Sequence, residues 1–365
     1  MITLKRKSLI LLAGLTVCNL QAQENMLRFI YCSDLHYGIK REFRGKQTDA
    51  DAVNREMMKA FELLKDARLP EDSGVNAGKI YGEAQFIVCT GDIANRMQDG
   101  AWTARHSWEQ FTKDWDDAVG TPVYLVPGNH DISNAIGHPE GLDSLADATC
   151  AAGIFNRTMR PKTARTSTTF RYDRDKVRYS FVKDSIRFAF SGMWIDKEAR
   201  EWLDTLIQKD GGMPTFLFTH DPVEAEAKHF TNPNGNHSIN ATDRFENLIT
   251  DTACVRNVKE CPRRNWHQLE MFIASHPQIK AYFHGDCNYN EFYTWKGTEG
   301  SVSLPVFRVD SPMKGEISSK DESKLSFIVV CIDTKRHLMT ARECLWNKGG
   351  KTSISWGETS TIHYK

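Results

Sequence analysis

The chain has 365 residues, of which 26% are charged and 40% hydrophobic, with equal numbers of acidic and basic side chains. This composition is typical of a globular protein and excludes a disordered or fibrous chain. The balanced charge does not indicate a broad basic surface for nucleic acid or for an anionic membrane.

The first 22 residues have the pattern of a secretory signal peptide. Basic residues 5–7 precede an apolar run, small residues follow it, and we expect cleavage after Ala22. The apolar run is too short to span a bilayer comfortably, so no transmembrane segment is expected after cleavage. A lipid anchor at Cys18 is the lesser alternative, because Val17 is a poor residue before such a cysteine. We therefore expect an exported protein, periplasmic or secreted.

Residues 23–365 are expected to form one domain. Without the signal segment the chain has 44 basic and 47 acidic residues, a net charge of −3, and eight cysteines. Cys254 and Cys261 are the most plausible disulfide pair in an exported protein. Three other cysteines lie inside apolar runs, where buried free thiols are the commoner state: Cys32, Cys89 and Cys331.

Short apolar runs, each followed by a polar loop, recur along the chain. They span residues 28–34, 85–92, 122–130, 186–194, 215–222 and 280–286. Helical patterns lie between several of them, at residues 49–67, 101–118, 196–209 and 266–276. This alternation predicts a mostly α/β core. Residues 302–346 change to strands without helices, which we expect to extend or back the sheet in an antiparallel way.

Polar residues of ligand type gather at the C-terminal ends of these runs. They are Asp34, Asp92, Asn129–His130, His220 and Asp286. Ligands bind at that edge of open α/β sheets. Five separate segments that bring such side chains to one edge predict a binding site there.

The first two of these segments offer carboxylates and an imidazole. Asp34 and His36 are two residues apart, so both point the same way in an extended chain and can hold one metal ion. Asp92 follows Gly91, whose missing side chain allows the loop to turn and approach closely. Taken alone, either motif favours an ordinary turn after a strand over a metal site.

The segments PGNHD and FTHDP add an amide and further imidazoles. Asn129 is a hard oxygen donor, and His130 can act as a proton donor with Asp131 orienting its ring. His220 follows an apolar strand, where a capped surface histidine is the alternative. The order of the motifs and their shared position at strand ends together favour a metal site over separate turns.

The motifs SDLH, TGD, PGNHD and FTHDP resemble, in content and order, those of the calcineurin-like metallophosphoesterase family over roughly residues 27–293. The resemblance implies a four-layer α/β/β/α sandwich, with two mixed sheets between helices and two metal ions at the strand ends. It implies that Asp34 and His36 bind the first metal, that Asp92 bridges both, and that Asn129 and His220 bind the second.

The same resemblance implies an activity. His130, assisted by Asp131, would protonate the leaving oxygen of a phosphate ester while a metal-bridging hydroxide attacks phosphorus in line. Two divalent ions about 3.5–4 Å apart can hold both oxygens of such a displacement. The implied ions are Mn²⁺, Fe²⁺, Zn²⁺ or Mg²⁺.

The chain departs from the family in the last motif, where Gly-His-x-His is replaced by residues 285–288, Gly-Asp-Cys-Asn. In one interpretation Asp286 binds the second metal and Asn288 the first, which favours a harder ion and Mn²⁺ above the others. In another the first site is weakened, because a neutral amide is a poorer ligand than imidazole. In a third the site has decayed, and the protein binds a phosphorylated ligand without turnover.

Residues beside these motifs have less certain roles. His284 is interpreted as structural, and Cys287 as a free or disulfide-bonded thiol. Tyr37, Asn95 and Arg96 either line a phosphate pocket or are solvated loop residues.

The predicted function is metal-dependent hydrolysis of a small phosphorylated substrate, either a monoester or a diester. The alternative is a catalytically impaired protein of the same fold that binds a phosphorylated ligand. The retention of His130 and Asp131 favours the enzyme, because ligand binding alone does not need a proton donor. The altered pair Asp286 and Asn288 favours the binding protein. The oligomeric state is left open.

Overall fold

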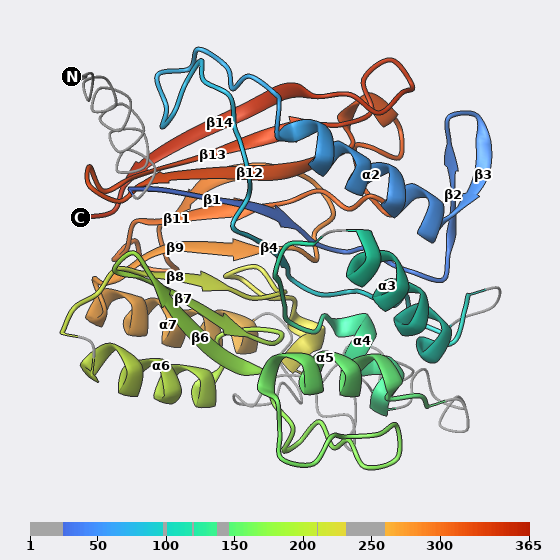
Figure 1. The fold of residues 1–365 in the computed structure, drawn as a ribbon. Helices are drawn as coiled ribbons and strands as arrows, with labels where there is room; N and C mark the ends of the chain where they lie inside the picture. Colours follow the sequence, from blue (N-terminus) through green and yellow to red (C-terminus); the bar gives the residue numbers. More distant parts are fainter. Residues whose placement is uncertain (1–24, 98–100, 119, 137–145, 210, 231–259) are drawn as a thin grey trace, which may run out of the picture.

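A computed structural model describes residues 25–97, 101–118, 120–136, 146–209, 211–230 and 260–365 (Figure 1). The predicted signal segment, Cys18 and the proposed partner Cys254 lie outside the described residues. Two six-stranded sheets dominate the described part of the chain, and a two-stranded hairpin adds a third, smaller sheet.

The first sheet has the strand order β14-β13-β12-β1-β4-β5. Its parallel half consists of β1 (Met26–Cys32), β4 (Phe86–Cys89) and β5 (Val123–Leu125). Its antiparallel half consists of β12 (Ser326–Asp333), β13 (Leu338–Leu345) and β14 (Ser355–His363). Strands β12 and β13 therefore extend this sheet in the antiparallel sense that the sequence predicts. The first strand of residues 302–346 differs, because residues 304–308 join the second sheet and pair parallel with residues 282–284.

The second sheet has the order β10-β11-β9-β8-β7-β6. Its parallel strands are β11 (Leu304–Arg308), β9 (Ile279–His284), β8 (Thr215–Phe218) and β7 (Ile186–Ser191). Antiparallel strands close both edges, β10 (Glu291–Trp295) on one side and β6 (Arg178–Lys183) on the other. Both large sheets are thus mixed.

The two sheets pack face to face through aromatic side chains. Phe29 of β1 is fully buried and stacks on Phe86 of the neighbouring strand, with ring centroids 4.9 Å apart. Its edge meets three rings of the second sheet, those of Phe188, Phe218 and Phe283. The interface between the sheets is therefore one continuous apolar core.

Helices cover the outer faces of the two sheets (Figure 1). On the side of the first sheet, α2 (Ala50–Leu64) packs Phe61 against Phe327 of β12. Helix α3 (Ala104–Ala118) lies against α2, and α5 (Thr149–Met159) lies against α3. On the second sheet, α6 (Lys197–Lys209) and α7 (Glu260–Ser275) form a separate apolar cluster with β8 and β9. The expected four-layer arrangement is confirmed.

Several elements differ from the sequence expectation. Residues 129–130 were expected to end the run of residues 122–130 and to be followed by a polar loop, but residues 129–136 form the short helix α4. The antiparallel strands continue beyond residue 346 as β14, and the hairpin of β2 (Lys40–Phe43) and β3 (Lys46–Asp49) was not anticipated. These segments are polar or half-exposed, so their hydrophobic patterns are weak.

The described cysteines bear out the expectation of buried thiols. Cys32, Cys89 and Cys331 are buried and free, and so are Cys150 and Cys344. None of the described helices is long and apolar enough to cross a membrane.

Candidate metal centre

Both sheets contribute to one site through the loops that follow their parallel strands. Asp34 and Asp92 follow β1 and β4 of the first sheet, whereas His220 and Asp286 follow β8 and β9 of the second. Backbone hydrogen bonds tie these loops together within each sheet: Asp34 N donates to Gly91 O at 3.0 Å, and Gly285 N donates to His220 O at 3.0 Å. The predicted convergence of strand ends is therefore present.

Five of the predicted ligands have an unfavourable backbone conformation. Their φ angles lie between 42° and 61°: Asp34, His36, Asp92, Asp286 and Asn288. Residues other than glycine adopt this left-handed region at a cost of order 1–3 kcal/mol, and such strain clusters at functional sites. The loops therefore hold these side chains in defined directions, and the strained backbone lowers local stability.

Glycines allow the loops to approach this closely. A Cβ at Gly285 would lie 2.2 Å from Asp34 Oδ2, and one at Gly128 would lie 2.2 Å from Asp92 Oδ1. Either contact is far inside van der Waals distance, so both positions exclude any side chain. The glycine in PGNHD thus serves the packing of Asp92.

Asp92 lies at the centre of the cluster. Its Oδ2 is 3.6 Å from His36 Nε2 and 3.8 Å from His130 Nε2, and its Oδ1 is 3.5 Å from His220 Nε2. Three groups have ligand atoms within 4.8 Å of one another: His36 with Asp92 and His130, Asp34 with Asp92 and His220, and His220 with Asp221 and Asp286. A carboxylate that belongs to two groups is suited to bridge two ions.

Buried atoms without partners fit a metal centre. Among the described residues, Asp34 Oδ1, His36 Nε2 and Asn288 Oδ1 are buried and have no hydrogen-bond partner. Such groups are rare in native proteins unless a water or an ion satisfies them. Carboxylate, amide and imidazole donors together suit divalent ions such as Mn²⁺, Fe²⁺ or Zn²⁺. The residues present therefore fit the implied metal ions.

The electrostatics of the cluster also favour bound cations. Burial raises the pKa of Asp92 well above its ordinary value, and the neighbouring Asp34 raises it further. Burial opposes protonation of His220, but Asp92, Asp34 and Asp286 outweigh it and raise the pKa of His220 to about 10. In the metal-free protein a proton on His220 therefore balances part of the negative charge.

His130 is held differently from the sequence expectation. Its Nδ1 accepts a hydrogen bond from the backbone amide of Arg96 at 2.8 Å, so a neutral ring carries its proton on Nε2, which faces Asp92. Burial lowers the pKa of His130 well below its usual range, and the nearby Lys314 lowers it further. The neutral ring thus presents an N–H donor to the site.

Asp131 does not orient the His130 ring. Its carboxylate accepts hydrogen bonds from three backbone amides, those of Ile93, Ala94 and Gly128, and from the thiol of Cys150. The side chain therefore fixes the loop that carries Asp92. It lies at the first turn of α4, and the helix sets its orientation.

The altered last motif brings Asp286 to the site and places Asn288 directly beside it in the chain. Asp286 Oδ1 lies 3.6 Å from His220 Nε2, and its backbone amide donates to Asp34 Oδ2 at 3.0 Å. Asn288 donates its Nδ2 to the Asp286 carbonyl at 2.8 Å, and this bond holds its amide group in place. Asn129 Oδ1 lies 3.2 Å from His220 Nε2. Asp286 and Asn129 therefore both adjoin His220.

Three neighbouring residues have structural roles. His284 is buried, and its Nδ1 lies 2.9 Å from Gly285 O, in agreement with the structural interpretation. Tyr37 does not line a phosphate pocket, because its ring is buried and its hydroxyl donates to Asp114 Oδ2 of α3 at 3.1 Å. Cys287 is a free, half-buried thiol.

The sequence reasoning missed two parts of the site. Asp221, next to His220, is fully buried, and its Oδ2 lies 2.9 Å from His229 Nδ1. Lys314 lies far along the chain, yet its positive charge acts on Asp92, Asp34 and Asp286. The Asp in FTHDP was a visible signal for the first, whereas no motif marks Lys314.

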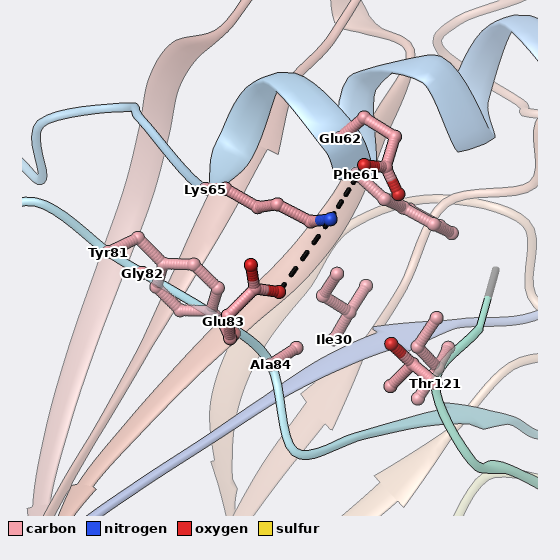
Figure 2. A pocket seen from close by; sticks show the side chains of 10 residues that line it. Ile30, Phe61, Glu62, Lys65, Tyr81, Gly82, Glu83, Ala84 and Thr121 are labelled. Atoms are coloured by element: carbon pink, nitrogen blue, oxygen red, sulfur yellow. Dashed lines mark ion pairs between the residues drawn. The ribbon is translucent and has the colours of Figure 1, made fainter.

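A separate hollow lies between the C-terminal end of α2 and the first sheet. Figure 2 shows Lys65 near its rim between two carboxylates, with ion pairs of 2.7 Å to Glu62 and 3.7 Å to Glu83. Its volume of about 20 Å³ is room for one water and not for an organic phosphate. It is therefore not a second substrate site.

The fold and the site together define an α/β protein with a buried cluster of metal-ligating side chains shared between two sheets. A model of the family described as calcineurin-like phosphoesterase matches residues 27–247, more than half of the chain. The chain belongs to the calcineurin-like phosphoesterase family. Comparison with the sequences of curated proteins gave no significant match.

Solved structures share the fold at low sequence identity. A dimetal phosphatase from Danio rerio matches with a TM-score of 0.53 and 12% identity, covering 93% of this chain and 99% of that one. Vps29 from Chaetomium thermophilum matches with a TM-score of 0.33 and 10% identity, covering 92% and 95% of the two chains. At these identities the first match supports the fold alone, and the second carries no argument.

Proposed function

We propose that this protein is a metal-dependent phosphoric ester hydrolase that acts on a small phosphorylated substrate. The observation that carries the proposal is the set of carboxylate and imidazole groups within 4.8 Å of one another around the shared Asp92. Membership of the calcineurin-like phosphoesterase family supports the same reaction class.

Seven side chains would hold two divalent ions. Asp34, His36 and Asn288 would bind the first ion, Asn129, His220 and Asp286 the second, and Asp92 both. Bound divalent ions supply Lewis acidity, which lowers the pKa of water and neutralises phosphoryl charge. Mn²⁺ is the favoured ion, because four of the side chains besides Asp92 offer oxygen donors: Asp34, Asn129, Asp286 and Asn288.

His130 would supply the proton to the leaving oxygen. The amide of Arg96 occupies its Nδ1, so the neutral ring carries the transferable proton on Nε2. Asp131 would contribute indirectly, by holding the loop of Asp92 through the amides of Ile93 and Ala94.

The test is hydrolysis of p-nitrophenyl phosphate and bis-p-nitrophenyl phosphate by metal-stripped protein to which Mn²⁺, Mg²⁺, Zn²⁺ or Fe²⁺ is returned. We expect metal-dependent turnover, and we expect His130→Ala to lower kcat by about 10²-fold or more without loss of bound metal. His363→Ala is the control, because that histidine is exposed on β14. Equal activity of the His130→Ala variant and the wild type would contradict the proposed proton donor.

The second candidate is a binding protein that does not turn its ligand over. The replacement of two imidazoles by Asp286 and Asn288 favours it. The double variant Asp286→His/Asn288→His separates the two candidates. Turnover only in the double variant would identify the natural protein as a binding protein, whereas turnover in the wild type makes Asp286 and Asn288 working ligands.

We also propose that the protein is exported after cleavage behind Ala22. The basic, apolar and small-residue segments of the first 22 residues support this proposal. N-terminal sequencing of the protein from its native host tests it. A mature chain that begins at residue 23 is expected, a lipidated Cys18 would indicate the anchored form, and a retained Met1 would contradict export.

A further inference from the structure

The loop of residues 310–318, here called the Lys314 loop, is fastened directly to two of the metal-binding segments. Ser311 Oγ donates to the backbone carbonyl of Asp34 at 2.7 Å, and Glu316 N donates to the carbonyl of Asn288 at 2.7 Å. The amide of Lys314 in turn donates to Ser311 Oγ at 2.9 Å. The backbone of Lys314 is therefore positioned relative to the residues proposed to hold the first metal.

The Lys314 loop is also rigid for a loop without regular structure. Arg41 of β2 donates to the carbonyls of Pro312 at 2.6 Å and Ser318 at 2.8 Å. A Cβ at Gly315 would lie 1.8 Å from Ser318 Oγ, so the turn after Lys314 is packed too tightly for any side chain. Such anchoring is what a residue needs to present its side chain at a fixed place.

The side chain of Lys314 brings a positive charge to the metal centre. Burial lowers the pKa of its ammonium, while Asp92, Asp34 and Asp286 act in the opposite sense. Among the described residues, no carboxylate forms an ion pair with it within 4.0 Å. Lys314 is half-buried. The charge is thus near the site without being bound to one protein carboxylate.

We propose that Lys314 is a substrate-binding residue whose ammonium contacts a terminal phosphoryl oxygen and makes the site prefer phosphate monoesters over diesters. The proposal rests on the proposed phosphoesterase function and names its substrate class.

The preference follows from the charges of the two ester types. A phosphate monoester carries about −1.5 to −2 charges at neutral pH, because its second pKa is about 6, whereas a diester has one ionisable oxygen fewer. Coulomb attraction is proportional to charge, so a fixed ammonium stabilises the bound monoester about twice as strongly. When the ammonium is removed, the fold loss in kcat/KM for a monoester should therefore be about the square of the fold loss for a diester.

The experiment compares Lys314→Met with the wild type on p-nitrophenyl phosphate and bis-p-nitrophenyl phosphate, both in the Mn²⁺-loaded state. We expect kcat/KM to fall about 100-fold for the monoester and about 10-fold for the diester. Lys314→Arg keeps the charge and should stay within about 5-fold of the wild type on both. The control Lys320→Met removes an exposed lysine just beyond the loop and should change neither rate.

Two measurements do not depend on turnover. Elemental analysis of Lys314→Met should show wild-type Mn²⁺ content, and calorimetry should show orthophosphate binding at least about 10-fold weaker than in the wild type. Equal losses for both esters, no loss, or a wild type that hydrolyses the diester alone would overturn the proposal.

A wild type that hydrolyses neither ester would contradict the proposed function. The orthophosphate titration then tests the role of Lys314 by itself. Weaker binding by the Lys314→Met variant would uphold the anion-binding role. Equal binding by both proteins, or no binding by the wild type, would overturn it.

Discussion

Asp92 shows how much of this site depends on single residues in strained conformations. Its φ of 50° is unfavourable for a side chain, yet three imidazoles lie within 3.8 Å of its carboxylate. Gly128 leaves room for its carboxylate, Gly91 leaves room for the backbone of Gly128, and Asp131 holds the loop behind it through backbone amides. A residue held this firmly keeps its direction whether or not a metal is bound.

The raised pKa of His220 predicts that metal binding releases a proton. The pKa of His220 is about 10 in the metal-free protein, so the ring is protonated at pH 7.5, whereas a metal ligand must be neutral. We expect about one proton per protein to be released when Mn²⁺ binds at this pH, and the apparent affinity to fall as the pH is lowered. Calorimetry in two buffers of different ionisation enthalpy measures the number of protons.

The raised pKa of His220 also predicts how the stability of the metal-free protein changes with pH. A folded-state pKa above the unfolded value means that the stabilisation by protonated His220 is complete below about pH 6.5 and is lost as the pH rises toward 10. His220→Gln should release about one proton fewer on binding Mn²⁺, while His363→Ala should match the wild type. No proton release by the wild type would contradict the assigned protonation.

At the scale of elements, the hairpin β2–β3 supports the site from a distance. It bears no predicted ligand, but Arg41 of β2 reaches two carbonyls of the Lys314 loop. Burial lowers the pKa of the Arg41 guanidinium, and Asp310 and Glu322 oppose this change. The hairpin therefore helps to order a loop that lies about 270 positions away in the sequence.

Arg41→Met should loosen the Lys314 loop. The change leaves two buried carbonyls without a donor, and we expect the free energy of unfolding to fall by about 2–4 kcal/mol. Urea denaturation measures this loss, and hydrogen exchange should become faster within residues 312–318. The control Lys40→Met removes an exposed charge from the same strand and should cost no more than about 0.5 kcal/mol. Unchanged exchange in the loop would refute its anchoring by Arg41.

At the scale of the whole molecule, the site exists because two sheets meet. β1 and β4 bring Asp34 and Asp92 from one sheet, and β8 and β9 bring His220 and Asp286 from the other. The aromatic layer around Phe29 sets the distance between the sheets. Stability and ligand geometry are thus coupled through one core.

Phe29→Ala should destabilise the entire fold. It removes a fully buried ring from the contact between the sheets, and such truncations cost about 3–5 kcal/mol. The measurement is urea or thermal denaturation of the metal-free protein, together with its Mn²⁺ affinity, which should fall as well. Val182→Ala is the control, because Val182 is 47% exposed on β6 and should change stability by about 0.5 kcal/mol or less. A loss below 1 kcal/mol for Phe29→Ala would contradict the importance of this layer.

Local pattern was enough to determine several features of this protein. Apolar runs of strand length, polar residues at their C-terminal ends and glycines beside Asp92 and Asp286 predicted the α/β class and the segments that converge. These features depend on backbone preferences and on the burial of neighbouring residues, which a short stretch of sequence contains. The polar residues at the strand ends could therefore be named before the fold was known, whereas their assignment to two metal ions comes from the family resemblance.

Other features were decided only by the tertiary structure. The amide of Arg96 sets the tautomer of His130, Asp131 serves a loop and not the ring beside it, and the charge of Lys314, from a loop beyond β11, acts on Asp92 and Asp34. Each of these three features depends on which groups of the two sheets come together and on which of their donors and acceptors still need a hydrogen-bond partner. Such contacts join residues far apart in the chain, and only folding brings their donors and acceptors together.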